Sequence, residues 1–263
     1  MMTTIPADAA IARVNILGAG ISALTMPLAV ARILAWVEQG ARQYVSVCTV
    51  HSVMEGRRSP AMRRAINGAG LATPDGMPLV WLGRRWSSAP VSRVYGPDLL
   101  LEVCRASVER GYSHFFLGGA AGVPELLAQK LQARFPGLAV AGAFSPPFRA
   151  LSPAEDEQLI DRLNAAKPDI IWVGLGTPKQ DLWMAGHRSR LDSPVLVGVG
   201  AAFDFHAGRI AQAPRWMQQA GLEWLFRLRQ EPRRLWYRYL VYNPLFIALI
   251  AAQAAGLKRY PLE

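Results

Sequence analysis

The chain has little of what a metal site or a disulfide framework would need. Only two of its 263 residues are cysteines and four are histidines. Cys48 and Cys104 lie in apolar or helical contexts, which favours buried thiols in a reducing compartment over a disulfide. No two histidines are four residues apart on a predicted helix, so we expect no zinc site among them; they are His51, His114, His187 and His206.

Acidic residues are also scarce. There are 19 Asp and Glu against 29 Lys and Arg, for a formal net charge of +10. This balance predicts a polyanionic partner such as nucleic acid, a nucleotide ligand or an anionic membrane surface. Because zinc-finger spacing, an aromatic RNA-binding signature and a helix-turn-helix pattern are missing, we expect no nucleic-acid partner.

Long apolar runs are missing too. The best candidate, residues 244–256, is about a dozen residues long and falls short of the roughly 20 that a membrane span needs. Residues 1–8 lack the basic start and apolar core of a signal peptide. We therefore expect no membrane span and a location on the cytoplasmic side.

What the chain does have is a regular alternation of helical patterns and short apolar runs, with 51% hydrophobic residues overall. This alternation predicts an α/β fold with a mostly parallel sheet and helices on both faces. The composition changes near residue 214, after which Arg, Trp, Tyr and Leu predominate. We therefore expect a catalytic domain over residues 1–213 and a helical appendage over residues 214–263.

Four of the apolar runs end in turns rich in glycine and polar side chains. The clearest is Ile170–Val173, which precedes Gly174, Gly176, an N-cap at Thr177-Pro178, and Lys179. The other three turns carry Asp75 after residues 72–74, Gly118 and Gly119 after residues 115–117, and Asp204 after residues 195–200. Because ligands bind beyond the carboxyl ends of parallel strands, the set predicts a phosphate-bearing ligand across this edge.

Asp75 and Arg93 each allow two interpretations. Asp75 lies between Pro74 and Gly76, so the turn presents its carboxylate at a strand end or uses it to cap the helix beginning near Met77. Arg93 precedes a turn, where it either clamps a phosphate or stays solvated at the surface.

Two other patterns suggest different chemistry. Gly18 to Ala23 matches the dinucleotide-binding fingerprint of an NAD-dependent oxidoreductase. The expected second strand, 44–50, lacks the carboxylate that would hold the ribose, so a plain glycine turn is favoured. Glu155 to Glu157 resembles a metal-binding acidic triplet, but Ser152 and Glu155 form a capping box at a helix start, which is the favoured interpretation.

Several stretches together resemble the WecG/TagA/CpsF glycosyltransferases, family 26. They occur in family order from about residue 14 to residue 240, nearly the whole chain, and read ATPDGMPLVW, RVYGPD, HFFLGG, SPPFR, PDIIWVGLGTPKQDLW, GVGAAFDFHAG and APRWMQQAGLEWLFRLRQEPRRLWYRYL. The resemblance implies a Rossmann-like, inverting, metal-independent enzyme without a cofactor. Such enzymes move a sugar from a UDP-sugar to a sugar on polyprenyl diphosphate.

The resemblance also implies roles for individual residues. The proposed catalytic base of the family falls on Asp75, and the family's threonine after the second strand falls on Thr49. A neighbouring asparagine of some members is His51 here, which is a departure. The family arginine is Arg93, and the glutamine of the PKQ motif is Gln180, followed by Asp181 where many members have Glu.

The donor sugar is less constrained than the reaction class. Within the family, the resemblance is closest to glucosyltransferases of the xanthan pathway, which implies UDP-glucose, a β-1,4 linkage and a role in exopolysaccharide assembly. N-acetylmannosamine or its uronic acid is the alternative donor.

The C-terminal appendage has two interpretations. Between residues 215 and 238, six arginines alternate with Trp and Tyr against only Glu223 and Glu231; they are Arg215, Arg227, Arg229, Arg233, Arg234 and Arg238. A helix with this pattern lies on an anionic membrane, with one arginine free to balance the leaving group, or covers the sheet as a last layer. The first predicts a peripheral protein on the cytoplasmic face of the bacterial inner membrane, with a homo-oligomer as one of the partner expectations. A non-enzymatic membrane scaffold remains the third functional alternative, beside the transferase and the oxidoreductase.

Overall fold

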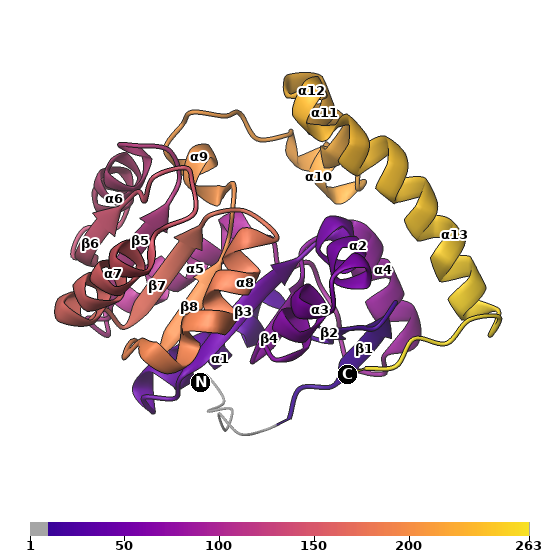
Figure 1. Ribbon diagram of the computed structural model, residues 1–263, viewed down its shortest axis with the longest axis horizontal. Coiled ribbons are helices and arrows are strands. Elements are labelled where there is room, and N and C mark those ends of the chain that lie inside the picture. Colours follow the sequence, from indigo (N-terminus) through magenta and orange to yellow (C-terminus); the bar gives the residue numbers. More distant parts are fainter. Residues whose placement is uncertain (1–9, 263) are drawn as a thin grey trace.

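A computed structural model describes residues 10–262 and contains a sheet of six parallel strands. The strand order is β4-β3-β8-β7-β5-β6, and the strands are β3 (Gln43–Cys48), β4 (Leu71–Pro74), β5 (Ser113–Gly118), β6 (Ala139–Phe144), β7 (Ile170–Gly174) and β8 (Val195–Gly198). After β4 the chain passes over β3, β8 and β7 to reach β5. The predicted Rossmann-like α/β fold is confirmed (Figure 1).

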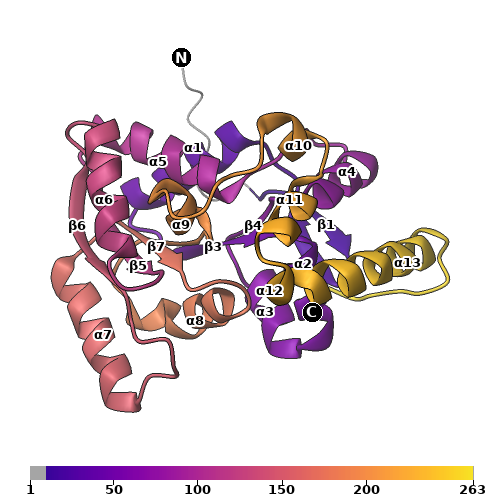
Figure 2. The same ribbon diagram turned by 90° about the horizontal axis from the view of Figure 1, so that it is seen from above.

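Helices cover both faces of this sheet. Ile170 and Trp172 of β7 pack into one apolar cluster, while Ile171 and Val173 pack into another on the opposite face. The first cluster is covered by α1 (Met26–Glu38), α5 (Gly96–Val108), α6 (Val123–Arg134) and α9 (Ala202–His206). The second is covered by α7 (Pro153–Ala166) and α8 (Lys179–His187), which is followed by a short 3₁₀ turn, Arg188–Arg190. Figure 2 shows α1 and α5 on one side of the strands and α7 and α8 on the other. Burial on both faces explains the continuous apolar runs in the sequence.

The glycines of the dinucleotide fingerprint form a hairpin turn. The strands β1 (Arg13–Ile16) and β2 (Ala19–Ser22) pair antiparallel in a small separate sheet. Leu17 and Gly18 between them have positive φ of 53° and 89°, as two-residue hairpin turns require. Helix α1 starts only at Met26, after Thr25. The favoured prediction of a plain glycine turn is confirmed, and the turn does not open a nucleotide-binding helix.

A third apolar cluster joins this hairpin to the end of the chain. It contains side chains of α2 (Val50–Arg58), α3 (Pro60–Asn67) and α4 (Met77–Trp86), together with Tyr242 and Phe246. Residues beyond the last helix then return to the hairpin, where Asn15 Nδ2 donates to the carbonyl of Tyr260 at 2.6 Å. The described residues that follow α13 therefore end beside β1 (Figure 1).

The C-terminal region is helical, as predicted, but it is not one helix from residue 215 to residue 238. It comprises α10 (Arg215–Gln219), α11 (Glu223–Gln230), α12 (Pro232–Trp236), a π-helical turn (Tyr237–Val241) and α13 (Tyr242–Ala254). Gly221, with φ of +74°, separates α10 from α11, and Pro232 opens α12.

The last three of these segments form one continuous helix, Pro232–Ala254, of 23 residues, and an 18-residue window within it has a mean hydropathy of 1.2. By length and composition alone it is long and apolar enough to cross a membrane, so the expectation that no segment reaches that length is wrong. The apolar segment expected from the sequence began at Pro244, and a proline inside an α-helix clashes with the carbonyl four residues earlier. The π-helical turn before Pro244 changes that register and lets the helix continue.

The predicted buried thiols and the predicted capping box are both present in the fold. Both cysteines are free and buried, and burial raises the pKa of the Cys48 thiol to about 12. Ser152 and Glu155 form the predicted capping box at the start of α7. The expectation about a signal peptide concerns residues 1–8, which lie outside the described residues.

Candidate active site

A cavity of about 1520 Å³ opens beyond the carboxyl ends of the strands. The carboxyl ends of β3, β4, β5, β7 and β8 and the turns that follow them form its floor and supply Thr49, Asp75, Gly119, Gly174 and Gly200. The C-terminal helices form the opposite wall and supply Glu223, Arg227, Arg238 and Phe246. The strand-end turns identified in the sequence therefore meet at one site.

Asp75 lies at this edge directly after β4. Its Oδ2 accepts a hydrogen bond from the backbone N–H of Gly96 at 3.1 Å, and its Oδ1 lies 3.1 Å from Arg93 Nη2. Helix α4 has Gly76 as its N-cap without a side-chain hydrogen bond, so Asp75 does not cap the helix that follows it. The carboxylate instead holds the first residue of α5 and faces the cavity with 12% of its side chain exposed.

The surroundings of Asp75 favour a basic carboxylate. Burial raises the pKa of the Asp75 carboxyl above its ordinary value; Arg93 opposes that rise and Glu223 adds to it. A carboxylate with a raised pKa accepts a proton more readily than a solvated one. The site therefore has a group suited to general-base chemistry.

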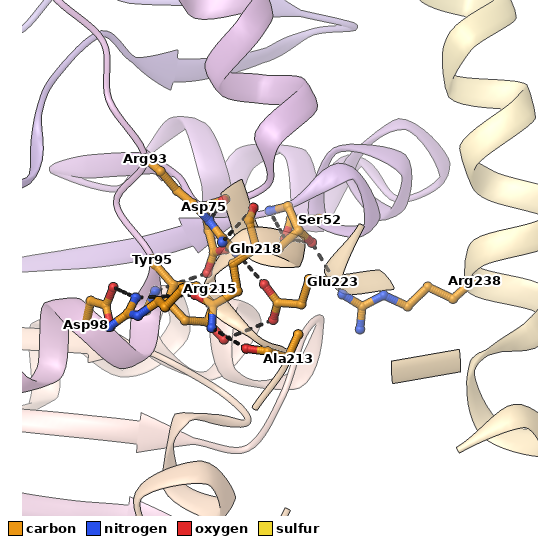
Figure 3. Close-up of polar contacts among 12 residues, drawn as sticks. Ser52, Asp75, Arg93, Tyr95, Asp98, Ala213, Arg215, Gln218, Glu223 and Arg238 are labelled. Carbon is orange, nitrogen blue, oxygen red and sulfur yellow. Dashed lines mark hydrogen bonds and ion pairs between the residues drawn. The ribbon is translucent and has the colours of Figure 1, made fainter. Parts of the chain in front are cut away.

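Arg93 is held on all three guanidinium nitrogens. Nε donates to the carbonyl of Asp75 at 2.6 Å, and Nη1 donates to the carbonyl of Gln218 at 3.5 Å. Nη2 contacts both Asp75 and Glu223, the latter at 2.6 Å (Figure 3). The guanidinium also lies 4.0 Å from the ring centroid of Tyr95. These contacts place Arg93 between protein carboxylates, so the predicted phosphate clamp would have to displace one of them.

Thr49 and His51 lie at the start of α2, on the cavity side. Thr49 is the N-cap of α2 and shares a capping box with Ser52. Arg238 Nη2 lies 3.5 Å from the Thr49 hydroxyl. Burial, assisted by Arg238, lowers the pKa of His51 to about 3, and its ring stacks on Tyr242. His51 is therefore neutral at physiological pH and offers hydrogen bonding rather than charge.

The predicted glycines divide into two groups. Gly118 does not line the cavity, and a Cβ there would lie 2.7 Å from the backbone of Gly174. Gly119, Gly174 and Gly176 do line it, although a Cβ on Gly174 would also lie 2.7 Å from the ring of Phe203. Gly176 has a φ of +75° and open space around it. Of these glycines, Gly176 has the geometry that lets a ligand approach the backbone.

The turn before α8 differs in detail from the prediction. Helix α8 begins at Lys179 with Pro178 as its N-cap, so Thr177 is not the N-cap. The Thr177 hydroxyl donates instead to Asp181 Oδ2 at 2.9 Å, and Ser46 donates to the other oxygen at 2.5 Å. Because the buried Asp181 carboxylate takes both hydroxyls, the helix start moves by one residue.

Lys179 and Gln180 face the cavity from this turn. Lys179 Nζ lies 4.7 Å from the ring centroid of Phe148, which belongs to the loop between β6 and α7 and also lines the cavity. Gln180 is buried, and its Oε1 accepts from the N–H of Gly176 at 3.1 Å. Gln180 therefore fixes the turn, while Lys179 remains available to an anion.

The six C-terminal arginines do not act as a group. Arg227, Arg234 and Arg238 line the cavity. Arg215 lies outside it and pairs with Asp98 at 2.8 Å. Arg229 and Arg233 are solvent-exposed and do not line the cavity. Asp204 lines the cavity beside Arg227 and Arg234, and burial raises the pKa of its carboxyl.

Among residues 10–262, no three His, Cys, Asp or Glu side chains are grouped as a metal ion would need. The acidic residues of the cavity are instead distributed among arginines. Metal independence stays a prediction.

The sequence of residues 14–260 matches the glycosyl transferase WecG/TagA/CpsF family. The chain belongs to this family. A curated relative from Bacillus spizizenii is 25% identical over 223 residues, which is 85% of this chain and 84% of the relative. Its name is N-acetylglucosaminyldiphosphoundecaprenol N-acetyl-beta-D-mannosaminyltransferase. The predicted family is confirmed and the chain is a glycosyltransferase, whereas a special closeness to xanthan-pathway glucosyltransferases is not supported.

Three residues of this glycosyltransferase site were not predicted as site residues from the sequence: Glu223, Tyr95 and Trp81. Glu223 stood out in the sequence only as a rare acid in a basic segment. Tyr95 lies inside the RVYGPD motif, two residues after Arg93, and its hydroxyl donates to Glu223 Oε1 at 2.9 Å. Tyr95 could have been found from its place in the RVYGPD motif. No local sequence pattern pairs Glu223 with Arg93, which is 130 residues away.

Proposed function

We propose that this glycosyltransferase moves N-acetylmannosamine, with inversion, from its UDP derivative to N-acetylglucosamine carried on a polyprenyl diphosphate. The name of the Bacillus relative supports this donor and acceptor. It favours the alternative donor of the sequence analysis over glucose. The observation that carries the catalytic part is the placement of Asp75, a buried carboxylate with a raised pKa, at the floor of the cavity.

In the proposed reaction, the acceptor hydroxyl attacks the anomeric carbon from the face opposite UDP. The new carbon–oxygen bond forms as the bond to UDP breaks, and the hydroxyl proton passes to Asp75. A positioned base of this kind contributes about 10²–10⁴-fold to the rate. Protonation of Asp75 would remove that contribution.

The leaving diphosphate needs positive charge, and the cavity offers it from two sides. Lys179 stands at the start of α8, while Arg227, Arg234 and Arg238 lie on the opposite wall. Cations and helix N-termini stabilise developing negative charge in a water-poor site. We propose that these groups balance the UDP charge without a metal ion.

An apolar end of the cavity suits the lipid of the acceptor. It lies between α4 and α13 and is lined by Trp81, Leu82, Phe246, Ile247 and Ile250. Trp236, Leu240 and Ile247 are 52%, 54% and 68% exposed along one side of the last helix. Such a face, flanked by arginines, is typical of helices that lie in a membrane interface. Because Trp216 and Trp236 are exposed, the alternative in which they form core contacts is not favoured.

We therefore propose a peripheral enzyme on the cytoplasmic face of the bacterial inner membrane. Tyr242 and Phe246 on the protein-facing side of the last helix are buried against the body, which supports surface association of that helix over a span. The possible homo-oligomer stays a prediction.

The test is a donor panel. Purified protein receives a short-chain lipid diphosphate bearing N-acetylglucosamine, a chelator, and one UDP-sugar at a time. We expect UDP release and a disaccharide lipid with UDP-N-acetylmannosamine. Turnover only with UDP-glucose or with UDP-N-acetylmannosaminuronic acid would overturn the donor, and well-folded protein that used no donor in the presence of membrane would favour the scaffold alternative.

A further inference from the structure

One guanidinium group joins two carboxylates at the edge of the cavity. Arg93 Nη2 lies 3.1 Å from Asp75 Oδ1 and 2.6 Å from Glu223 Oε2. Asp75 belongs to the turn after β4, whereas Glu223 is the first residue of α11 in the C-terminal region. The shorter of the two ion pairs is therefore the one that spans the cavity.

Glu223 is itself held in a defined position. Its Oε2 contacts Arg93 and its Oε1 accepts from the Tyr95 hydroxyl at 2.9 Å (Figure 3). Burial, followed by the charge of Glu223, raises the pKa of Tyr95, so the hydroxyl remains a donor. With 16% of its side chain exposed, Glu223 is about as enclosed as Asp75. Because hydrogen bonds hold both of its oxygens in a partly buried site, the Glu223 carboxylate has a fixed position, unlike a solvated surface acid.

The same region of α10 and α11 docks through further contacts. The carbonyl of Gln218 accepts from Arg93 Nη1, and Arg215 pairs with Asp98 of α5. The turn at Gly221 packs against Trp81, where a Cβ would lie 3.0 Å from the ring. The position of Glu223 therefore depends on the docking of the C-terminal helices.

We propose that Glu223 is a positioning residue that holds Arg93 away from full pairing with Asp75 and thereby keeps the Asp75 carboxylate basic. This rests on the proposed role of Asp75 as the base. An arginine that pairs with one carboxylate alone stabilises its charged form and weakens it as a base. A second carboxylate on the same nitrogen divides that stabilisation and leaves Asp75 more basic. The same contact aligns Arg93, which in turn aligns the Asp75 carboxylate.

The groups that face Asp75 are few. Arg93 and Tyr95 precede α5, Glu223 comes from α11, Arg238 comes from the π-helical turn, and the buried Cys48 thiol ends β3. Arg93 and Arg238 favour the charged form of Asp75, whereas Glu223 disfavours it. Removing the charge of Glu223 therefore moves the titration of Asp75 to lower pH.

The test is Glu223→Gln, which keeps the shape and removes the charge, compared with Tyr95→Phe. Glu102→Gln is the matched control, because Glu102 is a carboxylate on α5 that pairs with Arg105 away from the cavity. The readout is the pH profile of kcat/KM and the separate values of kcat and KM. We expect Glu223→Gln to lower kcat about 10-fold or more, the size expected for loss of one charged hydrogen bond. The acid limb should shift to lower pH, KM for UDP-sugar should change little, and Tyr95→Phe should give a smaller change of the same sign.

The outcomes separate this proposal from the proposed function. Normal kcat and an unchanged acid limb in Glu223→Gln, with Asp75→Asn inactive, would overturn the positioning role and leave Asp75 as the base. Loss of the acid limb in Glu223→Gln, with Asp75→Asn active, would make Glu223 the base and overturn both assignments. A variant is folded if its melting temperature and its UDP affinity equal those of the control. If Glu223→Gln does not fold, Tyr95→Phe tests the same contact.

Discussion

Asp75→Asn is the substitution with the most specific expected result. The carboxylate accepts one hydrogen bond on each oxygen, from Arg93 and from the N–H of Gly96. Asparagine has one acceptor oxygen, so its NH₂ group must face one of these two donors. Leaving a buried donor unsatisfied costs about 1–3 kcal/mol of folding stability.

The effect of Asp75→Asn on catalysis should be larger. Loss of a general base lowers kcat by about 10²–10⁴-fold, which corresponds to about 3–5 kcal/mol in the barrier. UDP affinity should remain close to normal, because the cations that face the diphosphate are unchanged. Because burial raises the pKa of Asp75, the wild-type rate should fall on the acid side as this carboxylate becomes protonated, and the variant should lose that limb.

The assay follows UDP release across pH, with UDP binding by calorimetry and thermal unfolding as folding checks. Asp192→Asn is the control, since Asp192 forms a surface pair with Arg42 and its side chain is 65% exposed. A folded Asp75→Asn protein with near-normal kcat would show that Asp75 is not the general base.

Three further predictions concern packing, the lipid and metal. Gly174→Ala should lower stability by about 1–3 kcal/mol, because the added Cβ would lie 2.7 Å from the ring of Phe203; Gly186→Ala in α8, where nothing lies within 4 Å, should not lower it, and equal melting temperatures for the two would contradict the packing argument. Ile247→Glu should raise KM for a long-chain lipid acceptor while leaving KM for a short-chain acceptor unchanged. Leu182→Glu, at an exposed position outside the cavity, should change neither KM. If Ile247→Glu changed KM equally for both acceptors, or for neither, this lipid site would be excluded. Treatment with a chelator should leave the initial rate unchanged, whereas activity restored by added divalent cations would show that the arginines do not suffice.

The sheet was predictable because its signals are local. Apolar runs such as Ile170–Val173, followed by glycine turns, identify buried parallel strands and the edge where they end. That edge carries Asp75 and Gly119, which the strand-end turns predicted, and Thr49, which only the family resemblance indicated. The capping box at Ser152 and the start of α1 after Thr25 were predictable for the same reason.

The opposite wall was not predictable from local pattern. Glu223 reaches Arg93 across 130 residues, and a lone acid among arginines carries no mark of its partner. Arg229 and Arg233 share a segment and a charge with Arg227, yet only Arg227 lines the cavity. Which arginine faces inward depends on the breaks at Gly221 and Pro232 and on the docking angle of each short helix.

The length of the long C-terminal helix was not predictable from the apolar segment at residues 244–256. Pro244 usually marks the first turn of a helix, because it lacks an N–H donor and its ring clashes with the preceding turn. Here the π-helical turn Tyr237–Val241 accommodates it, and the helix extends from Pro232 to Ala254. Such a turn has no signature that the composition of this segment would reveal.

The anomeric configuration of the product tests most directly whether the enzyme transfers N-acetylmannosamine with inversion. The lipid formed from UDP-N-acetylmannosamine and the N-acetylglucosamine acceptor is isolated, and the one-bond carbon–hydrogen coupling at the new linkage is measured by NMR. We expect a β-linked N-acetylmannosamine, inverted relative to the α-linked donor, and no such product from Asp75→Asn. An α-linked product, or a transferred sugar other than N-acetylmannosamine when several donors compete, would contradict it.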